Sequence, residues 1–129
     1  MTPVRPLVVA AAVLVLPASA GLFGTPVAAG GGVQKDGHCS RYSDWELRAQ
    51  PDDGRIRVRG EVDSNRTGQR WRWRILHDGA VTARGRATTR GRGSFEVERL
   101  ILNAPGEDHI GWRAINRASG ETCRGRLTY

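Results

Sequence analysis

The chain has 129 residues and a formal net charge of +7 at pH 7, with 20 Lys and Arg residues against 13 Asp and Glu residues. This length allows one small domain with a modest core and excludes a second domain, while the basic balance suits an anionic partner. The sequence contains no HExxH, GxSxG or CxxC motif and no phosphate-binding glycine loop. We therefore predict a protein that is not an enzyme and that binds no cofactor.

Residues 1–20 are predicted to be a signal peptide. Arg5 precedes the apolar run of residues 7–16, Pro17 ends that run, and the small residues 18–20 form a cleavage site. Two alternatives stay open: cleavage as late as residue 29, and a retained membrane anchor, because residues 6–34 carry no charge. Residues 21–37 are rich in Gly, Ala and Pro and are predicted to be a flexible segment before a β-sandwich domain of residues 38–129. The expected location is secreted or extracellular, in association with the cell envelope.

The only two cysteines, Cys39 and Cys123, lie near the two ends of the predicted domain. In an exported chain the expected state is an intramolecular disulfide, which would tie the start of the domain to its last strand. The alternatives are a metal thiolate or a nucleophilic cysteine. Both need further ligands or a paired base, and His38 is the only such neighbour in sequence.

Residues 69–76 alternate strictly between apolar and basic side chains. The apolar set is Trp71, Trp73 and Ile75, and the basic set is Arg70, Arg72 and Arg74. A strand places these two sets on opposite faces, whereas a helix would spread the tryptophans around its circumference at about 100° per residue. The segment is therefore predicted to be a central strand of an all-β domain.

Six further short strands are predicted from alternating segments separated by turn sequences such as Pro51-Asp52-Asp53-Gly54 and Asp78-Gly79. They cover residues 42–48, 55–63, 80–88, 94–101, 109–116 and 121–129. Seven short strands without a helical period predict an immunoglobulin-like antiparallel β-sandwich. A small barrel is the alternative architecture.

Four short segments carry a resemblance to known proteins: Gly93-Ser94-Phe95, Gly106-Glu107-Asp108, Arg113-Ala114-Ile115-Asn116 and Cys123. In these segments the chain resembles small exported bacterial proteins of unknown function that have a single disulfide and an immunoglobulin-like β-sandwich. The resemblance implies the fold and export. It implies no active site.

The predicted sandwich separates the outward-facing side chains by charge. Strands 69–76, 80–88, 109–116 and 121–129 are expected to share one sheet, with strands 42–48, 55–63 and 94–101 in the other. On the first of these sheets the outward charged residues are Arg70, Arg72, Arg74, Arg84, Arg86, Arg113, Arg124 and Arg126. On the other sheet carboxylates are mixed with Arg48, Arg55, Arg57, Arg59 and Arg99. In strand 80–88 the residues expected on the core side are Val81, Ala83 and Gly85.

We expect the arginine-rich sheet face to bind an anionic polymer or an acidic protein surface, because arginine forms bidentate contacts with phosphate, sulfate and carboxylate groups. The alternative is a solvated face that only keeps the domain soluble. Specific nucleic-acid recognition is not predicted, since Trp71, Trp73 and Trp112 are expected in the core and not in a base-stacking surface. A membrane partner is expected only if the N-terminal segment is retained as an anchor.

Two further functions are kept as alternatives. The end of strand 69–76 and the start of strand 109–116 are expected to meet, which makes His77, Asp78 and His109 candidate zinc or copper ligands, near Glu107 and Asp108. Asp78 is also the expected hairpin residue. The second alternative is an adhesion or inhibitor module that presents a loop such as residues 87–93 to a protein partner. No feature of the sequence indicates an oligomeric state.

Overall fold

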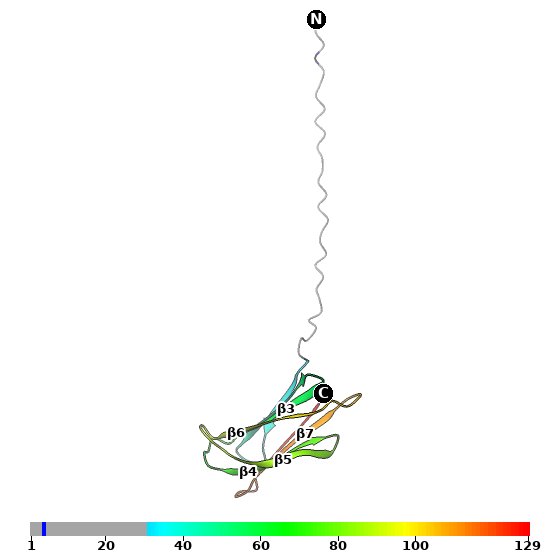
Figure 1. Ribbon diagram of the computed structural model, residues 1–129. Coiled ribbons are helices and arrows are strands. Elements are labelled where there is room, and N and C mark those ends of the chain that lie inside the picture. The colour runs from blue at the N-terminus through cyan, green and yellow to red at the C-terminus, as the bar shows by residue number, and fades with distance from the viewer. Residues whose placement is uncertain (1–3, 5–30) are drawn as a thin grey trace.

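The computed structural model describes residue 4 and residues 31–129. The predicted signal peptide, its cleavage sites and the first part of the flexible segment lie outside these residues, apart from Val4. Within the described residues, eight antiparallel strands form two four-stranded sheets that pack face to face (Figure 1). No helix in this part of the chain is long and apolar enough to cross a membrane.

The chain passes from one sheet to the other after the strands that end at Asp63, Thr88 and Leu102. One sheet has the order β1-β2-β3-β6 and consists of β1 (Val33–His38), β2 (Asp44–Asp52), β3 (Arg55–Asp63) and β6 (Ser94–Leu102). The other has the order β5-β4-β7-β8 and consists of β4 (Arg70–His77), β5 (Ala80–Thr88), β7 (His109–Asn116) and β8 (Thr122–Thr128). This arrangement is the predicted immunoglobulin-like sandwich, and it confirms the predicted division of the strands between two sheets.

The core lies between the sheets and contains the tryptophans that the alternation of β4 places inward. Trp71 and Trp112 are fully buried, and Trp73 is only 3% exposed. The rings of Trp73 and Trp112 stack with their centroids 6.2 Å apart. The prediction that these three rings are core residues is confirmed, and none of them is available at the surface.

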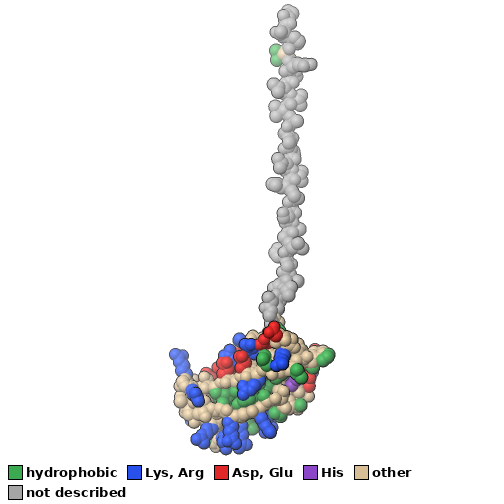
Figure 2. Space-filling model, in the orientation of Figure 1, with side chains coloured by type: hydrophobic (Ala, Val, Ile, Leu, Met, Phe, Trp, Pro, Cys, Tyr) green, Lys and Arg blue, Asp and Glu red, His purple; other side chains and the backbone are tan. Residues whose placement is uncertain are grey.

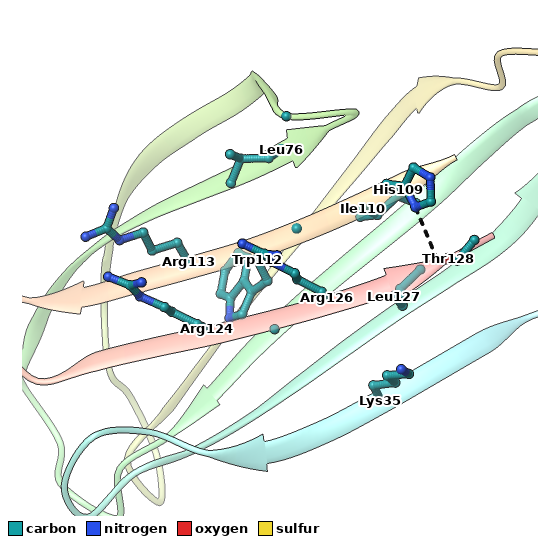
Figure 3. Close-up of a pocket in the computed structure, with 13 residues that line it drawn as sticks. Lys35, Leu76, His109, Ile110, Trp112, Arg113, Arg124, Arg126, Leu127 and Thr128 are labelled. Carbon is teal, nitrogen blue, oxygen red and sulfur yellow. Dashed lines mark hydrogen bonds between the residues drawn. The ribbon is translucent and has the colours of Figure 1, made fainter. Parts of the chain in front are cut away.

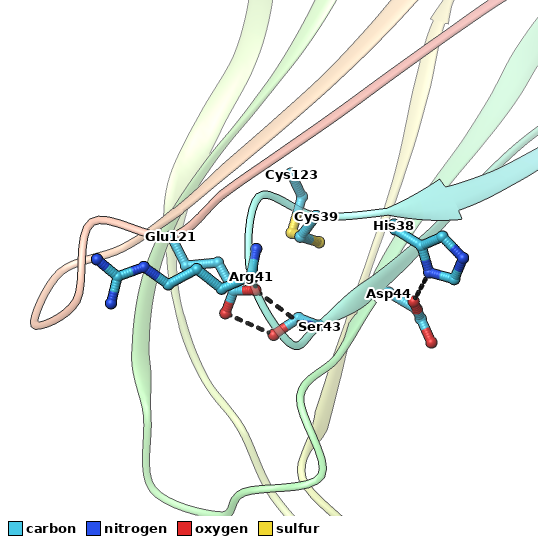
Figure 4. Close-up of polar contacts among 7 residues, drawn as sticks. All are labelled: His38, Cys39, Arg41, Ser43, Asp44, Glu121 and Cys123. Carbon is cyan, nitrogen blue, oxygen red and sulfur yellow. Dashed lines mark hydrogen bonds and ion pairs between the residues drawn. A yellow bond between two sulfur atoms is a disulfide. The ribbon is translucent and has the colours of Figure 1, made fainter.

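The loop between β1 and β2 is attached to the start of β8 by a disulfide and by Glu121, the residue before the strand (Figure 4). Ser40 of the same loop also exchanges two hydrogen bonds with Thr122. Cys39 and Cys123 form the predicted disulfide. Beside it the buried carboxylate of Glu121 accepts hydrogen bonds from the backbone N of Arg41 at 3.2 Å and from the backbone N and the Oγ of Ser43, both at 2.8 Å. A disulfide is typical of proteins that mature in an oxidising compartment.

β1 corrects the predicted number of strands and the predicted end of the flexible segment. Residues 33–37, assigned to that segment, belong to β1, which pairs with β2 from Val33 opposite Ala49 to His38 opposite Asp44. The sequence VQKDGH lacks an apolar alternation because β1 lies at the edge of its sheet and only Val33 packs against the core. The first predicted strand, residues 42–48, is therefore the second strand of the fold and extends to Asp52.

Two predicted side-chain orientations were wrong. The pairing of β4 with β5 shifts between Ile75 and Leu76, so Leu76 lies opposite Val81, which is 47% exposed on the outer face and not in the core. Arg99 lies opposite the buried Val58 on the inner face of β6, and its guanidinium carbon is 4.9 Å from the centroid of the Trp73 ring. Because β6 is an edge strand, the long Arg99 side chain reaches solvent from the inner face.

Candidate anion-binding face

Four arginines form a row across the outer face of the β5-β4-β7-β8 sheet. Arg84 is the cross-strand partner of Arg74, Arg74 of Arg113, and Arg113 of Arg124. The row crosses all four strands at the usual spacing of about 4.8 Å. Arg86 and Arg72 form a second pair beside it. With the outward Arg70 and Arg126, these are all the predicted anion-binding residues, and we call them the arginine face: Arg70, Arg72, Arg74, Arg84, Arg86, Arg113, Arg124 and Arg126.

None of these guanidinium groups forms an ion pair with a carboxylate among residues 31–129. On the other sheet, in contrast, Arg57 contacts Asp52 and Glu98, and the hydrogen bond and charge of Asp52 raise the pKa of Arg57. Figure 2 shows the difference, with basic side chains projecting below β4 and β5 and acidic ones gathered on the opposite side of the molecule. Arg48, Arg57 and Arg59 of one sheet are thus paired with carboxylates, whereas no arginine of the arginine face is paired within the described residues.

The arginine row has an electrostatic cost in the isolated molecule. Like charges directly opposite each other on neighbouring strands destabilise a sheet, by roughly 0.2–1 kcal/mol for each pair. The buried Nε of Arg113, in the middle of the row, also has no hydrogen-bond partner. A bound anion would relieve the repulsion.

A pocket of about 520 Å³ lies at one end of the arginine face, over β7 and β8 (Figure 3). Gly111 of β7 lines the pocket between its cross-strand partners Leu76 and Arg126. Arg113 and Arg124 complete the charged side of the pocket. The pocket therefore offers guanidinium donors next to a small apolar surface. The sequence signal that could have revealed it is a glycine at an outward position of an arginine-lined strand.

The structure brings together only part of the predicted metal-binding cluster. His77 Nε2 lies 2.5 Å from Oδ1 of Asp108 and 3.5 Å from Oδ2 of Asp78. The ring of His109 is directed elsewhere, with Nδ1 3.3 Å from Oγ1 of Thr128. The three side chains that lie close enough to hold a metal ion together are His77, Asp78 and Asp108, and the side chain of Asp108 is buried.

Asp108 has a structural role that alternation could not predict. Its Oδ1 accepts a hydrogen bond from the backbone N of Ala104 at 3.1 Å, and its own backbone exchanges two hydrogen bonds with Tyr129. Together with His77, it therefore holds the loop between β6 and β7 against β4 and the end of the chain. The hydrogen bond that Asp78 accepts from the backbone N of His109, at 2.9 Å, closes the same corner.

The loop of residues 87–93, the alternative site for a protein partner, is held near its start by the hydrogen bonds of Thr89. Thr89 is buried, and its Oγ1 donates to the backbone O of Arg66 and accepts from the backbone N of Gln69. The side chains of Arg90 and Arg92 are exposed beyond this anchor.

The sequence matches no known protein family, and neither a curated protein nor a solved structure is significantly similar to it.

Proposed function

We propose that this chain is an exported, non-catalytic module that binds an anionic polymer or an acidic partner at the cell envelope through its arginine face. The observation that carries the proposal is the row of Arg84, Arg74, Arg113 and Arg124, which has no carboxylate partner among the described residues. Export is supported by the predicted signal peptide and by the Cys39–Cys123 disulfide.

The distribution of the charges favours a polymer over a small anion. The row is about 15 Å long at the usual strand spacing, and a second arginine pair lies beside it. A small anion would contact two or three of these groups and leave the others unneutralised. A chain of phosphate, sulfate or carboxylate groups would contact the whole face, and each arginine can bind such a group with two parallel hydrogen bonds.

The test is binding of the oxidised protein to heparin, teichoic acid and single-stranded DNA over a salt series. The variant Arg74→Ser, Arg113→Ser, Arg124→Ser removes the centre of the face. For single-stranded DNA each lost phosphate contact should reduce the slope of log K against log salt by about 0.7, so the triple variant should lose about 2 in slope and most of its affinity.

The matched control is Arg66→Ser, Arg90→Ser, Arg92→Ser, which removes the same charge from exposed loop positions. It should retain most of the affinity. Equal losses in the two variants would show that only net charge attracts the polymer. An absence of binding to all three polymers near physiological salt would contradict the proposal.

A further inference from the structure

The opposite face of the molecule carries a row of carboxylates that matches the arginine row. On the outer face of the β1-β2-β3-β6 sheet, Asp36 is the cross-strand partner of Glu46, Glu46 of Glu61, and Glu61 of Glu96. This row also crosses four strands. Asp44 and Asp63 form the next pair along β2 and β3. We call this surface the acidic face: Asp36, Asp44, Glu46, Glu61, Asp63 and Glu96.

The acidic face is only partly neutralised by the arginines beside it. Arg59 contacts both Glu61 and Glu96, and Arg48 lies 3.7 Å from Glu46. Asp36 and Asp63 make no ion pair with any described residue. The face therefore keeps a negative charge.

The carboxylates of this row also repel one another. Partial burial raises the pKa of Glu61, and the charges of Glu46, Glu96 and Asp63 raise it further against the opposing effect of Arg59. A cationic surface docked on the row would relieve this repulsion, as an anion would on the arginine row. The two rows cannot relieve each other within one molecule, because they lie on the outer faces of opposite sheets.

We propose that the acidic face of one copy of this chain docks on the arginine face of another copy. The inference rests on the proposed function, since it names a second copy as an acidic partner of the same arginine face. The two rows have the same number of charges at the same strand spacing, and sheets of the same twist pack face to face at about −30°. Long arginine side chains can span the offset that this angle introduces.

The contact is heterologous, because it joins two different surfaces. Each added copy leaves one free arginine face and one free acidic face, so the assembly grows into a ring or an open filament and not into a closed dimer. Four strands and about six residues per strand give a contact of about 19 Å by 20 Å on each copy. This area is about half of the roughly 800 Å² per partner that is usual in specific complexes, so we expect weak, transient association that depends on salt.

Sedimentation of the oxidised protein tests the proposal. At about 0.1 M salt, where the Debye length is about 10 Å, the average mass should rise with protein concentration. At about 1 M salt, where it is about 3 Å, the protein should be monomeric. A wild-type protein that stays monomeric at high concentration in about 0.1 M salt would overturn the proposal.

Charge exchange tests the pairing of the two rows. One variant carries Arg74→Glu and Arg113→Glu, and the other carries Glu46→Arg and Glu61→Arg. Each alone places like charges in the contact and should weaken association by about tenfold or more. Their mixture restores opposite charges in every contact between the two variants and should associate again. Failure of the mixture, with both variants folded and oxidised, would overturn the proposal, as would undiminished association of either variant alone.

A milder variant, Glu46→Gln with Glu61→Gln, separates this inference from the proposed function. It should lose association while it retains heparin binding, because its arginine face is unchanged. Heparin should also dissociate wild-type assemblies, since polymer and second copy occupy the same face. Polymer binding by a protein that never associates would refute only the second-copy inference. If the wild type neither binds polymer nor associates, both are refuted.

Discussion

Individual glycines make room for the tryptophan rings of the core. A Cβ atom at Gly60 would lie 2.4 Å from Cε3 of Trp112, and one at Gly85 would lie 2.7 Å from Cζ2 of Trp73. Neither glycine has a positive φ, so the backbone conformation does not require glycine at these positions. What requires it is space, because a core only two sheets thick has to accommodate large rings from β4 and β7.

Gly60→Ala should therefore destabilise the protein by about 1–3 kcal/mol, the usual cost of overpacking a core. Urea unfolding of the oxidised protein measures this loss. The control is Gly111→Ala on the outer face, where the nearest atom to the new Cβ would be Cβ of Leu76, at 3.3 Å. Its loss should be clearly smaller. Equal stability of the Gly60→Ala variant and the wild type would show that the Trp112 ring can move aside.

Among the elements, β1 depends on attachments outside its own strand. Apart from Val33 its residues contribute no apolar side chain to the core, and the loop after it is held by the disulfide and by Glu121. Both attachments fix the same short loop to the start of β8, beside the hydrogen bonds between Ser40 and Thr122. Their contributions to the free energy of unfolding should therefore depend on each other.

A double-mutant cycle measures this dependence. Cys39→Ser with Cys123→Ser should cost about 2–5 kcal/mol, and Glu121→Gln about 1–3 kcal/mol because Ser43 loses its buried charged acceptor. The combined variant should lose less than the sum, since a released loop no longer needs Glu121. Asp63→Asn, an exposed carboxylate on β3, serves as control and should change stability by less than about 0.5 kcal/mol. Additive losses would mean that the two attachments act independently.

The elements that the sequence predicted well are those with a strict alternation of side chains. In β4 the alternation alone placed Trp71 and Trp73 on one face and the arginines on the other. The assumption of an immunoglobulin-like topology then placed all eight arginines on the same sheet. The arginine face was therefore predictable as a surface. Its lack of ion pairs was predictable too, because none of the four strands contains an Asp or Glu residue. The alignment of Arg84, Arg74, Arg113 and Arg124 in one row was not, because it depends on cross-strand register, which alternation does not determine.

The remaining errors arise where local pattern and tertiary position differ. The bulge between Ile75 and Leu76 places Val81 on the outer face of the sheet and not on the core side, and no residue type in β5 indicates that the bulge is there. Arg99 is two residues after the inward-facing Val97, so alternation places it on the inner face of β6. A charged residue is nevertheless expected on the outer face, unless it is known that β6 is an edge strand and that the Trp73 ring lies beside Arg99. Asp108 and Glu121 have the sequence context of turns, but both carboxylates are buried. That of Glu121 accepts hydrogen bonds from Ser43 of a distant segment, and that of Asp108 contacts the distant His77 and accepts from the nearby backbone N of Ala104.

Over the whole molecule, charge is divided between two opposite faces, and the two sheets should respond differently to salt. Screening weakens attractive pairs such as Arg57 with Asp52 and Arg59 with Glu96 on one sheet. On the other sheet it weakens only repulsion among the arginines. Surface ion pairs typically contribute less than about 1 kcal/mol each, and screening also weakens the repulsion among the carboxylates of the acidic face. Relief of repulsion on both sheets should therefore determine the net effect.

We therefore expect the free energy of unfolding to rise by about 1–2 kcal/mol between about 0.1 M and about 1 M sodium chloride, measured by urea unfolding at a protein concentration low enough to keep the chain monomeric. The variant Arg74→Ser, Arg113→Ser removes every opposed pair of the row, so it should be more stable than the wild type at low salt and should lose most of the salt-dependent gain. Arg66→Ser with Arg92→Ser, which removes the same charge from loops, should keep that gain and thereby correct for general effects of salt. A wild-type stability that falls with salt would mean that the arginine side chains already avoid one another in solvent. The row would then lack the repulsion that a bound polymer or a second copy is proposed to relieve.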